Sequence, residues 1–306
     1  MPGTLTGLIP ACHTPFDRNG ELNLAVVDKQ AALFLETGMR GVFVAGTTGE
    51  FASLTIDERK ALCDRWASVA GGALRVAVHV GSNCLADAID LAAHARQAGV
   101  AAIAVAPPSY FKPATIPDLI DFCVPIAAEV EPLPFYYYHI PCMTGVRLPM
   151  AEFLREARFR IPNLRGLKFS HDDLVDLQGC VAAEKNAYDV LFGFDEGLLA
   201  GLCMGVRGAV GATYNFAGRH YLKLMRAFET GDMAAARAAQ LDATEMVKTL
   251  ASFGFLPASK AVMALIGVDC GPVRPPLRNL TSGQIDSLAN KLSERDVFAR
   301  PLQLLA

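Results

Sequence analysis

Lys168 lies in the middle of RGLKFS (165–170), a short segment with the apolar pattern of a buried strand. The chain contains nine lysines, and the other eight fall in segments that have the pattern of helices or loops. Burial disfavours the charged ammonium, so it lowers the pKa of lysine and leaves a neutral amine that attacks carbonyl carbons. The position therefore predicts a Schiff-base nucleophile. The structural alternative is a lysine neutralised by a carboxylate across the fold, for which Asp195 is available.

Tyr138 is a candidate for proton transfer beside that lysine. It is the last tyrosine of FYYYHIP (135–141), and strand alternation places it on the same face as Tyr136 and Ile140. A tyrosine transfers protons near neutral pH only with help from neighbouring groups, and Thr47 and Tyr110 are candidates for a hydroxyl relay. The alternative for each tyrosine of this run is aromatic packing in the core.

The segment GTTGE (46–50) is rich in glycine and hydroxyl side chains. Taken alone, it fits an ordinary turn from a strand into a helix. Beside a strand-end lysine, its backbone N–H groups and hydroxyls are suited to hold a substrate carboxylate. The chain has no GxxxxGK[ST], HExxH or GxGxxG motif, so nucleotide and zinc chemistry have little support.

Eight short apolar runs alternate with segments of helical periodicity, and this order must position the candidate residues. Continuous apolar strands joined by helices predict a parallel sheet that is buried on both faces. Eight such units predict a (β/α)8 TIM barrel over residues 1–231, with a doubly wound open sheet as the alternative. Residues 232–306 predict a C-terminal extension of three helices packed on the barrel. The predicted strand runs cover 7–15, 41–50, 75–81, 102–108, 134–141, 165–170, 189–196 and 208–215.

Polar and aromatic residues collect at the carboxyl ends of these predicted strands. In a barrel of this kind the active site lies at that end. The residues concerned are Thr47, Thr48, Glu50, His79, Tyr110, Tyr138, Lys168, Ser170, Asp195, Glu196, Thr213 and Tyr214. This one-sided accumulation of hydroxyls and carboxylates predicts a site for a small polar molecule.

Composition excludes several other classes of function. The formal net charge is −3 and 52% of the residues are hydrophobic, which gives no electrostatic case for binding nucleic acid or a membrane surface. No apolar run approaches the length of a membrane span, and the N-terminus lacks an export signal. Eight scattered cysteines form no CxxC pair, so they are expected to be reduced and the protein to be cytoplasmic.

Three motifs occur together: GTTGE at 46–50, Y-x-I-P at 138–141 and G-x-K at 166–168. In this order and spacing they resemble the pyruvate-dependent Schiff-base lyase family that includes dihydrodipicolinate synthase and N-acetylneuraminate lyase. The resemblance implies a barrel that assembles as a homotetramer, a dimer of dimers, and needs no cofactor or metal. It implies roles for Lys168 as the iminium lysine, Tyr138 in proton transfer, Thr47 in the relay and Thr48 at the pyruvate carboxylate. It also implies that Tyr110 enters a neighbouring subunit's site.

Within that family, the second substrate distinguishes the branches. Dihydrodipicolinate synthases place an arginine after the Y-x-V/I-P motif, where this chain has Met143, and Arg147 is off the pattern. The phrases YYYHIPCMTGV, GLKFSHDDL and FGFDE resemble the N-acetylneuraminate lyase branch instead. That likeness implies that a polyhydroxy chain binds at the residues Ser170, Gly193, Asp195, Glu196 and Gly211. Solvated acidic residues at a helix N-terminus are the alternative for the two carboxylates.

One position departs from the lyase pattern. Ala212 stands in GATYN where these lyases commonly have serine, so a hydroxyl expected to contact the substrate is missing. The expected reaction is cleavage of N-acetylneuraminate to pyruvate and N-acetylmannosamine. The alternatives are a dihydrodipicolinate synthase and an aldolase for another 2-keto-3-deoxy sugar acid.

Overall fold

The computed structural model describes residues 5–303, so the first four residues of the predicted barrel and the last three of the predicted extension lie outside it. Eight parallel strands follow the order β1-β8-β7-β6-β5-β4-β3-β2. A parallel bridge between Ala11 and Phe43 joins the two ends, and the (β/α)8 barrel predicted from the sequence is thereby confirmed. The strands are β1 Gly7–Pro10, β2 Gly41–Val44, β3 Arg75–His79, β4 Ala102–Val105, β5 Phe135–His139, β6 Leu164–Phe169, β7 Asp189–Phe192 and β8 Gly208–Gly211.

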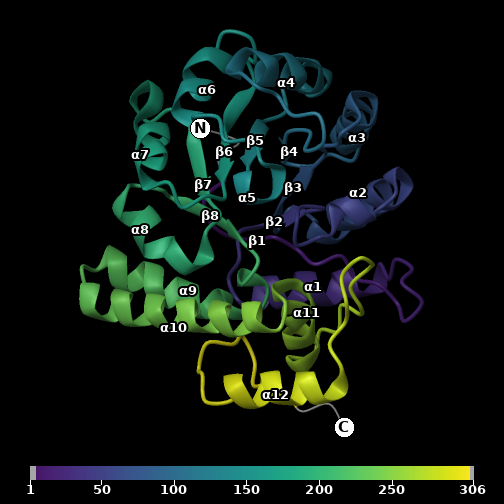
Figure 1. The fold of residues 1–306 in the computed structure, drawn as a ribbon, viewed down its shortest axis with the longest axis vertical. Helices are drawn as coiled ribbons and strands as arrows, with labels where there is room; N and C mark the ends of the chain where they lie inside the picture. The colour runs from purple at the N-terminus through teal and green to yellow at the C-terminus, as the bar shows by residue number, and fades with distance from the viewer. Residues whose placement is uncertain (1–4, 304–306) are drawn as a thin grey trace.

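Helices follow every strand and surround the barrel (Figure 1). The α-helices of the barrel are α1 Ala25–Glu36, α2 Ile56–Ala70, α3 Leu85–Gln97, α4 Ile116–Val130, α5 Pro141–Thr144, α6 Met150–Ala157, α7 Leu174–Ala182, α8 Leu198–Cys203 and α9 Tyr214–Glu229. Short 3₁₀ helices are η1 Phe51–Ser53, η2 Ala183–Lys185 and η3 Asp195–Gly197. Among residues 5–303, no helix combines the length and the apolar character that crossing a membrane requires.

Most strands are shorter than the apolar runs that predicted them. The run 41–50 contains a strand only over Gly41–Val44, and the run 189–196 only over Asp189–Phe192. The remainder of each run forms the loop that follows the strand. These loops are only partly exposed, and apolar residues such as Ala45 and Phe194 continue in them, which explains why the apolar runs extend past the strands.

Two apolar clusters explain why these sequences form a closed barrel. Inside the barrel, small residues such as Ala77, Ala102 and Ala104 pack with the rings of Tyr136 and Tyr138. Outside, the alternate strand residues face the helices in one large cluster, which includes Val76, Val78, Ile103, Val105 and Tyr137. Strand alternation thus places Tyr138 in the interior and its neighbour Tyr137 on the helix-facing side, as the sequence predicts.

Helix α2 begins directly after Thr55, which caps it. The Thr55 side chain accepts a hydrogen bond from the Glu58 N–H, while the Glu58 carboxylate accepts one from the Thr55 N–H. This capping box fixes the point at which the loop after β2 ends, because it satisfies backbone donors that have no partner inside the helix. The loop in question carries Thr47 and Thr48.

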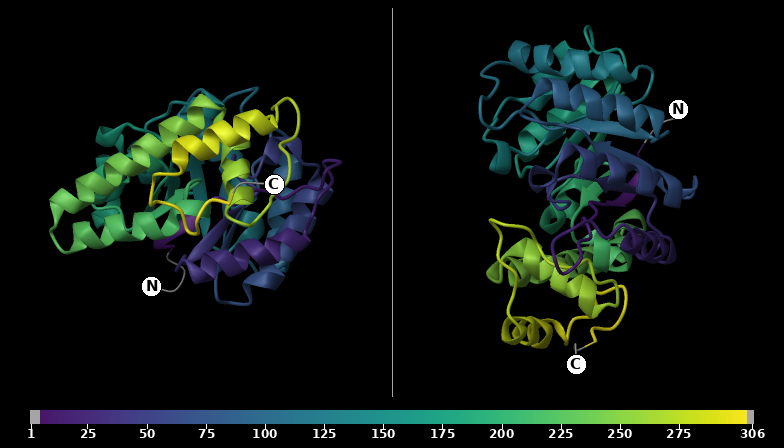
Figure 2. Two further views of the ribbon diagram at one scale, coloured as in Figure 1. Left: turned by 90° about the horizontal axis from the view of Figure 1, so that it is seen from below. Right: turned by 90° about the vertical axis from the view of Figure 1, so that its right-hand side faces the viewer.

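Three further helices follow the barrel: α10 Met233–Ser252, α11 Phe255–Leu265 and α12 Ser282–Leu292. They are the green-to-yellow helices of Figures 1 and 2, where α10 runs along α9 and α12 lies farther from the barrel. Three helices in this region agree with the sequence prediction. The predicted division after residue 231 falls in the short turn between α9 and α10.

Candidate active site

Lys168 is buried inside the barrel, with only 3% of its surface exposed. Strand β6 carries it inward, opposite Tyr138 of β5 and Leu191 of β7. Its Nζ lies 4.0 Å from the centre of the Phe43 ring and 4.0 Å from that of Tyr138. The amine therefore lies between two aromatic rings, close to the carboxyl end of the barrel.

Burial lowers the pKa of Lys168 to about 7, although the negative charge of Asp195 opposes this shift. In the described part of the chain Lys168 forms no ion pair, although the charge of Asp195 is close enough to act on its pKa. At neutral pH a substantial fraction of this amine is uncharged, compared with about 1 in 2,500 for a lysine in water. An uncharged amine beside an accessible carbonyl can form an iminium.

Tyr138 provides a hydroxyl next to this amine. Its phenol oxygen lies 3.1 Å from Thr47 Oγ1, and the Ser170 side chain is close enough to act on its pKa. Burial raises the pKa of Tyr138 to about 12, while the hydrogen bonds from Thr47 and Ser170 act in the opposite direction. The structure thus brings together four residues that the sequence predicts for the site, namely Lys168, Tyr138, Thr47 and Ser170.

Asp195 is held at the carboxyl end of the barrel by the loop after β8. Its Oδ2 accepts hydrogen bonds from Thr213 N at 2.9 Å and Thr213 Oγ1 at 2.6 Å. Burial raises the pKa of the Asp195 carboxyl, and the Thr213 bonds and the charge of Lys168 reduce that effect. The carboxyl group is therefore fixed in position after β7, the strand next to that of Lys168, and is close enough for their charges to interact.

Gly193 and Gly211 allow close approach at this end of the barrel. A side chain at Gly193 would bring a Cβ within 2.1 Å of Ser170 Oγ, and one at Gly211 within 2.0 Å of Asp195 Oδ1. Both positions therefore require glycine for packing within the site. Glu196 follows Asp195 on η3 and is half-buried; burial and the neighbouring Asp195 raise the pKa of its carboxyl.

The residues of the GTTGE segment make contacts in different parts of the molecule. Thr47 and Thr48 lie in the turn after β2, whereas Glu50 forms an ion pair with Lys260 of α11, with 2.7 Å between Oε1 and Nζ. Both side chains are almost fully buried, at 2% and 3% exposed. The backbone N–H of Arg274 also donates to Glu50, and Lys260 donates to Pro272 O. The C-terminal helices therefore anchor the loop that carries the two threonines.

Helix α10 contacts the opposite side of the site. Gln240 Nε2 donates to Asp195 O at 3.3 Å, and its Oε1 accepts from Leu199 N at 2.8 Å. Thr244 Oγ1 donates to Glu196 O at 3.2 Å. The C-terminal extension thus supports both the threonine turn and the two neighbouring carboxylates.

Tyr110 is separate from this group of residues. Its side chain is 80% exposed and packs edge-on against Phe111, which is 84% exposed. Its backbone N–H and that of Ser109 donate to Asn83, which holds the loop after β4 in this conformation. Two adjacent exposed aromatic rings are unusual on a free surface and typical of protein contacts.

Met143 lies on α5, directly after the Tyr138 strand, and is 63% exposed. Arg147 lines a cavity with His139 and His171 on the side of helices α6 and α7. It is therefore not the arginine that the synthases place after their Y-x-V/I-P motif.

Phe43 and Lys260 support the site but are missing from the residues predicted by the sequence, and Thr213 was predicted only as a strand-end residue. Phe43 packs against Lys168, Thr213 holds Asp195 and Lys260 pairs with Glu50. Strand alternation in GVFV would have indicated Phe43, and Thr213 stands among the strand-end residues. Nothing in the local sequence of α11 marks Lys260 as buried.

The fold and these residues define a (β/α)8 barrel with a buried amine and a polar site at the carboxyl end of its strands. The profile of the Dihydrodipicolinate synthetase family matches residues 4–295. The chain therefore belongs to that family.

Proteins named N-acetylneuraminate lyase are among those to which the chain is similar. The N-acetylneuraminate lyase of Xenopus tropicalis is 40% identical over 299 residues, covering 96% of this chain and 98% of the relative. The solved N-acetylneuraminate lyase of Proteus mirabilis is 38% identical with a TM-score of 0.94, covering 96% of this chain and 99% of that one. That of Aliivibrio salmonicida is 39% identical with the same TM-score, covering 96% and 98%.

Proposed function

We propose that this chain cleaves N-acetylneuraminate to pyruvate and N-acetylmannosamine through a Schiff base on Lys168. The burial of Lys168 between Phe43 and Tyr138, which lowers its pKa to about 7, is the observation that supports this mechanism most directly. The similarity to proteins named N-acetylneuraminate lyase, at 38–40% identity over nearly the whole chain, supports the substrate.

The reaction begins with the open-chain 2-keto acid. Its carboxylate binds at Thr48 and the adjoining backbone, and the neutral Lys168 amine attacks C2. Loss of water gives the iminium, which can accept electrons from the neighbouring C3–C4 bond. The chemistry that a metal or an organic cofactor supplies in other lyases is here supplied by the lysine itself.

Tyr138 removes the proton from the C4 hydroxyl. Its pKa of about 12 in the free protein disfavours the phenolate, but the iminium places a positive charge beside the Tyr138 ring until the bond breaks. A cation at this distance lowers the pKa of the phenol, and Thr47 and Ser170 hydrogen bonds stabilise the anion further. The C3–C4 electrons then pass into the iminium and form an enamine, and N-acetylmannosamine leaves. Protonation at C3 and hydrolysis release pyruvate and restore the amine.

The sugar chain extends toward η3. Asp195 and Glu196 provide carboxylate oxygens that accept hydrogen bonds from several hydroxyls. Ser170, Gly193 and Gly211 form the adjoining wall, where the glycines leave backbone groups accessible. Ala212 contributes no hydroxyl, so we expect the substrate to bind without one of the contacts that the lyase pattern implies.

Pyruvate release from N-acetylneuraminate, coupled to reduction of pyruvate to lactate, tests the proposed substrate. We expect steady turnover, and for Ala212→Ser a KM lower by roughly three- to tenfold, since a hydrogen bond contributes about 0.5–1.5 kcal/mol. Aspartate semialdehyde with pyruvate, and other 2-keto-3-deoxy sugar acids, are the comparison substrates. Faster turnover of any of these would contradict the proposed substrate but leave the Schiff base intact.

The pH dependence of adduct formation tests the charge of Lys168. Because the attacking amine must be neutral, the rate of pyruvate adduct formation, trapped with cyanoborohydride, is expected to rise with pH around a midpoint near 7. Asp195→Asn removes the anion that favours the ammonium, so the midpoint should move to lower pH. Glu196→Gln is the matched control, with no shift expected. A midpoint near the ordinary lysine value of about 10.4 would contradict a desolvated amine.

We propose further that the protein is a homotetramer, a dimer of dimers, in which Tyr110 completes the relay of a neighbouring subunit. The exposure of Tyr110 and Phe111 supports a contact between chains. Free cysteines, five of the eight buried, support a reducing, cytoplasmic setting.

Subunit mixing tests the role of Tyr110. Homomers of Tyr110→Phe and of Lys168→Ala are each expected to have low activity. In a mixed dimer, the first subunit keeps its lysine and receives an intact Tyr110 from the second, so part of the activity should return. If mixtures exchange subunits, as shown by mass spectrometry, and still recover no activity, Tyr110 does not act across the interface.

A further inference from the structure

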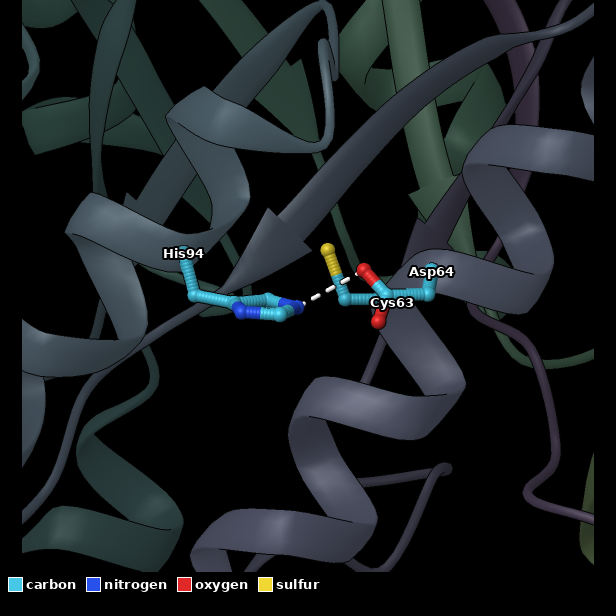
Figure 3. Close-up of side chains that lie close together, drawn as sticks. All are labelled: Cys63, Asp64 and His94. Carbon is cyan, nitrogen blue, oxygen red and sulfur yellow. Dashed lines mark hydrogen bonds and ion pairs between the residues drawn. The ribbon is translucent and has the colours of Figure 1, made fainter.

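A second group of reactive side chains lies outside the barrel, between helices α2 and α3. Cys63 and Asp64 belong to α2 and His94 to α3, and Figure 3 shows the imidazole directed toward the Asp64 carboxylate with the Cys63 sulfur beside it. His94 Nε2 and Asp64 Oδ1 are 2.7 Å apart. One ligand atom from each of the three residues lies within 4.8 Å of the other two.

The three donors fit a borderline divalent cation. Thiolate, imidazole and carboxylate are the ligands that Zn²⁺ takes in proteins, at about 2.0–2.3 Å, so the ligand atoms of a tetrahedral site stand roughly 3.5 Å apart. The His94–Asp64 pair would need to open and Cys63 Sγ to approach, each by about an ångström, which side-chain rotation can supply. Calcium and magnesium, which prefer oxygen ligands, fit this set poorly.

The three residues lie between the buried core and the protein surface. Cys63 is 2% exposed, whereas the side chains of His94 and Asp64 are 26% and 57% exposed. One helical turn earlier, Lys60 pairs with Asp90 at 2.6 Å and joins the same two helices. The backbones of α2 and α3 are therefore held in register, so the ligands are brought together before a cation arrives. The exposed side remains open to water.

We propose that Cys63, Asp64 and His94 bind Zn²⁺, with a water molecule as the fourth ligand. Binding replaces the thiol proton, which passes to solvent, and forms Zn–S, Zn–N and Zn–O bonds without any change of oxidation state. The cation links α2 to α3 on the outer surface of the barrel. This site is independent of the Schiff-base mechanism and of the identity of the substrate.

Cobalt is a direct probe, because Co²⁺ takes the same ligands and absorbs visibly when tetrahedral. The full-length protein, freed of metal by a chelator, is titrated with Co²⁺ and then with Zn²⁺. We expect visible d–d bands, a thiolate-to-Co²⁺ charge-transfer band in the near ultraviolet, and loss of both when Zn²⁺ displaces the probe. Cys63→Ser should remove the charge-transfer band, and His94→Gln should weaken Co²⁺ binding at least tenfold.

Two controls separate this site from adventitious binding. The double variant Cys84→Ser/Cys203→Ser removes two exposed thiols and should keep the full spectrum. His171→Gln disrupts another His–Asp pair, His171 with Asp172 at 2.9 Å, and should also have no effect. If Cys63→Ser does not fold, Asp64→Asn and His94→Gln, both at partly exposed positions, still test the site. A wild-type protein without a charge-transfer band, or a band that His94→Gln leaves unchanged, would overturn the proposal.

Discussion

Replacing Lys168 by alanine is expected to reduce pyruvate release from N-acetylneuraminate by at least roughly 10⁴-fold, which corresponds to about 5.5 kcal/mol of transition-state stabilisation. Without the amine no iminium forms, and the C3–C4 electrons have no acceptor. Borohydride reduction in the presence of pyruvate should add mass to the wild-type protein and none to the variant. Steady-state kinetics and intact-protein mass spectrometry measure the two effects.

Two controls show that the effect depends on the amine itself. Lys168→Arg keeps a positive charge but cannot form the iminium, so it should be as inactive as the alanine variant. Peptide mapping of the reduced wild-type protein should place the adduct on Lys168 and leave Lys260, which is equally buried, unmodified. Full turnover in Lys168→Ala would show that the mechanism is wrong.

Removing the Tyr138 hydroxyl is expected to have the second largest effect. In Tyr138→Phe, kcat should fall by about 10²–10⁴-fold, the usual contribution of a general acid/base. The pyruvate adduct should still form on Lys168, because the amine and its apolar surroundings are retained. Rapid-quench trapping and steady-state turnover therefore separate bond cleavage from iminium formation.

Tyr137→Phe is the matched control for this substitution. Tyr137 is adjacent in the sequence, but strand alternation directs it to the helix-facing cluster, and its buried hydroxyl has no hydrogen-bond partner among the described residues. Its loss should leave kcat close to the wild-type value. Equal effects of the two substitutions would indicate that the tyrosines act through packing and not through proton transfer.

The barrel was predictable because each of its strands and helices leaves a recognisable pattern in a short segment of the sequence. Apolar runs such as 102–108 and caps such as Thr55 each indicate one element, and eight repeats of strand and helix leave few topologies. Lys168 was predictable for a related reason, because an ionisable side chain is unusual within an apolar strand. Strand ends were less predictable, since apolar residues continue past the strands into partly buried loops.

Contacts between distant segments could not be predicted in the same way. Thr213 and Asp195 are 18 residues apart, and Glu50 and Lys260 are far more distant in sequence. No local sequence pattern indicates that either pair is in contact. Lys260 lies on a helix, where a lysine ordinarily faces solvent, so its burial becomes visible only when α11 packs against the loop after β2. The proposed role of Tyr110 requires a second chain, which no pattern in the sequence describes.

The support that α10 and α11 give to the site has a consequence for how such proteins diversify. Lys260 holds the threonine turn, and Gln240 and Thr244 hold the backbone of Asp195 and Glu196. A buried ion pair that loses one partner destabilises a protein by about 3–5 kcal/mol, so α11 cannot be exchanged between relatives without its matching loop. The barrel and its C-terminal helices therefore have to change together, and substitutions in α10 or α11 can alter the loops that carry the site residues.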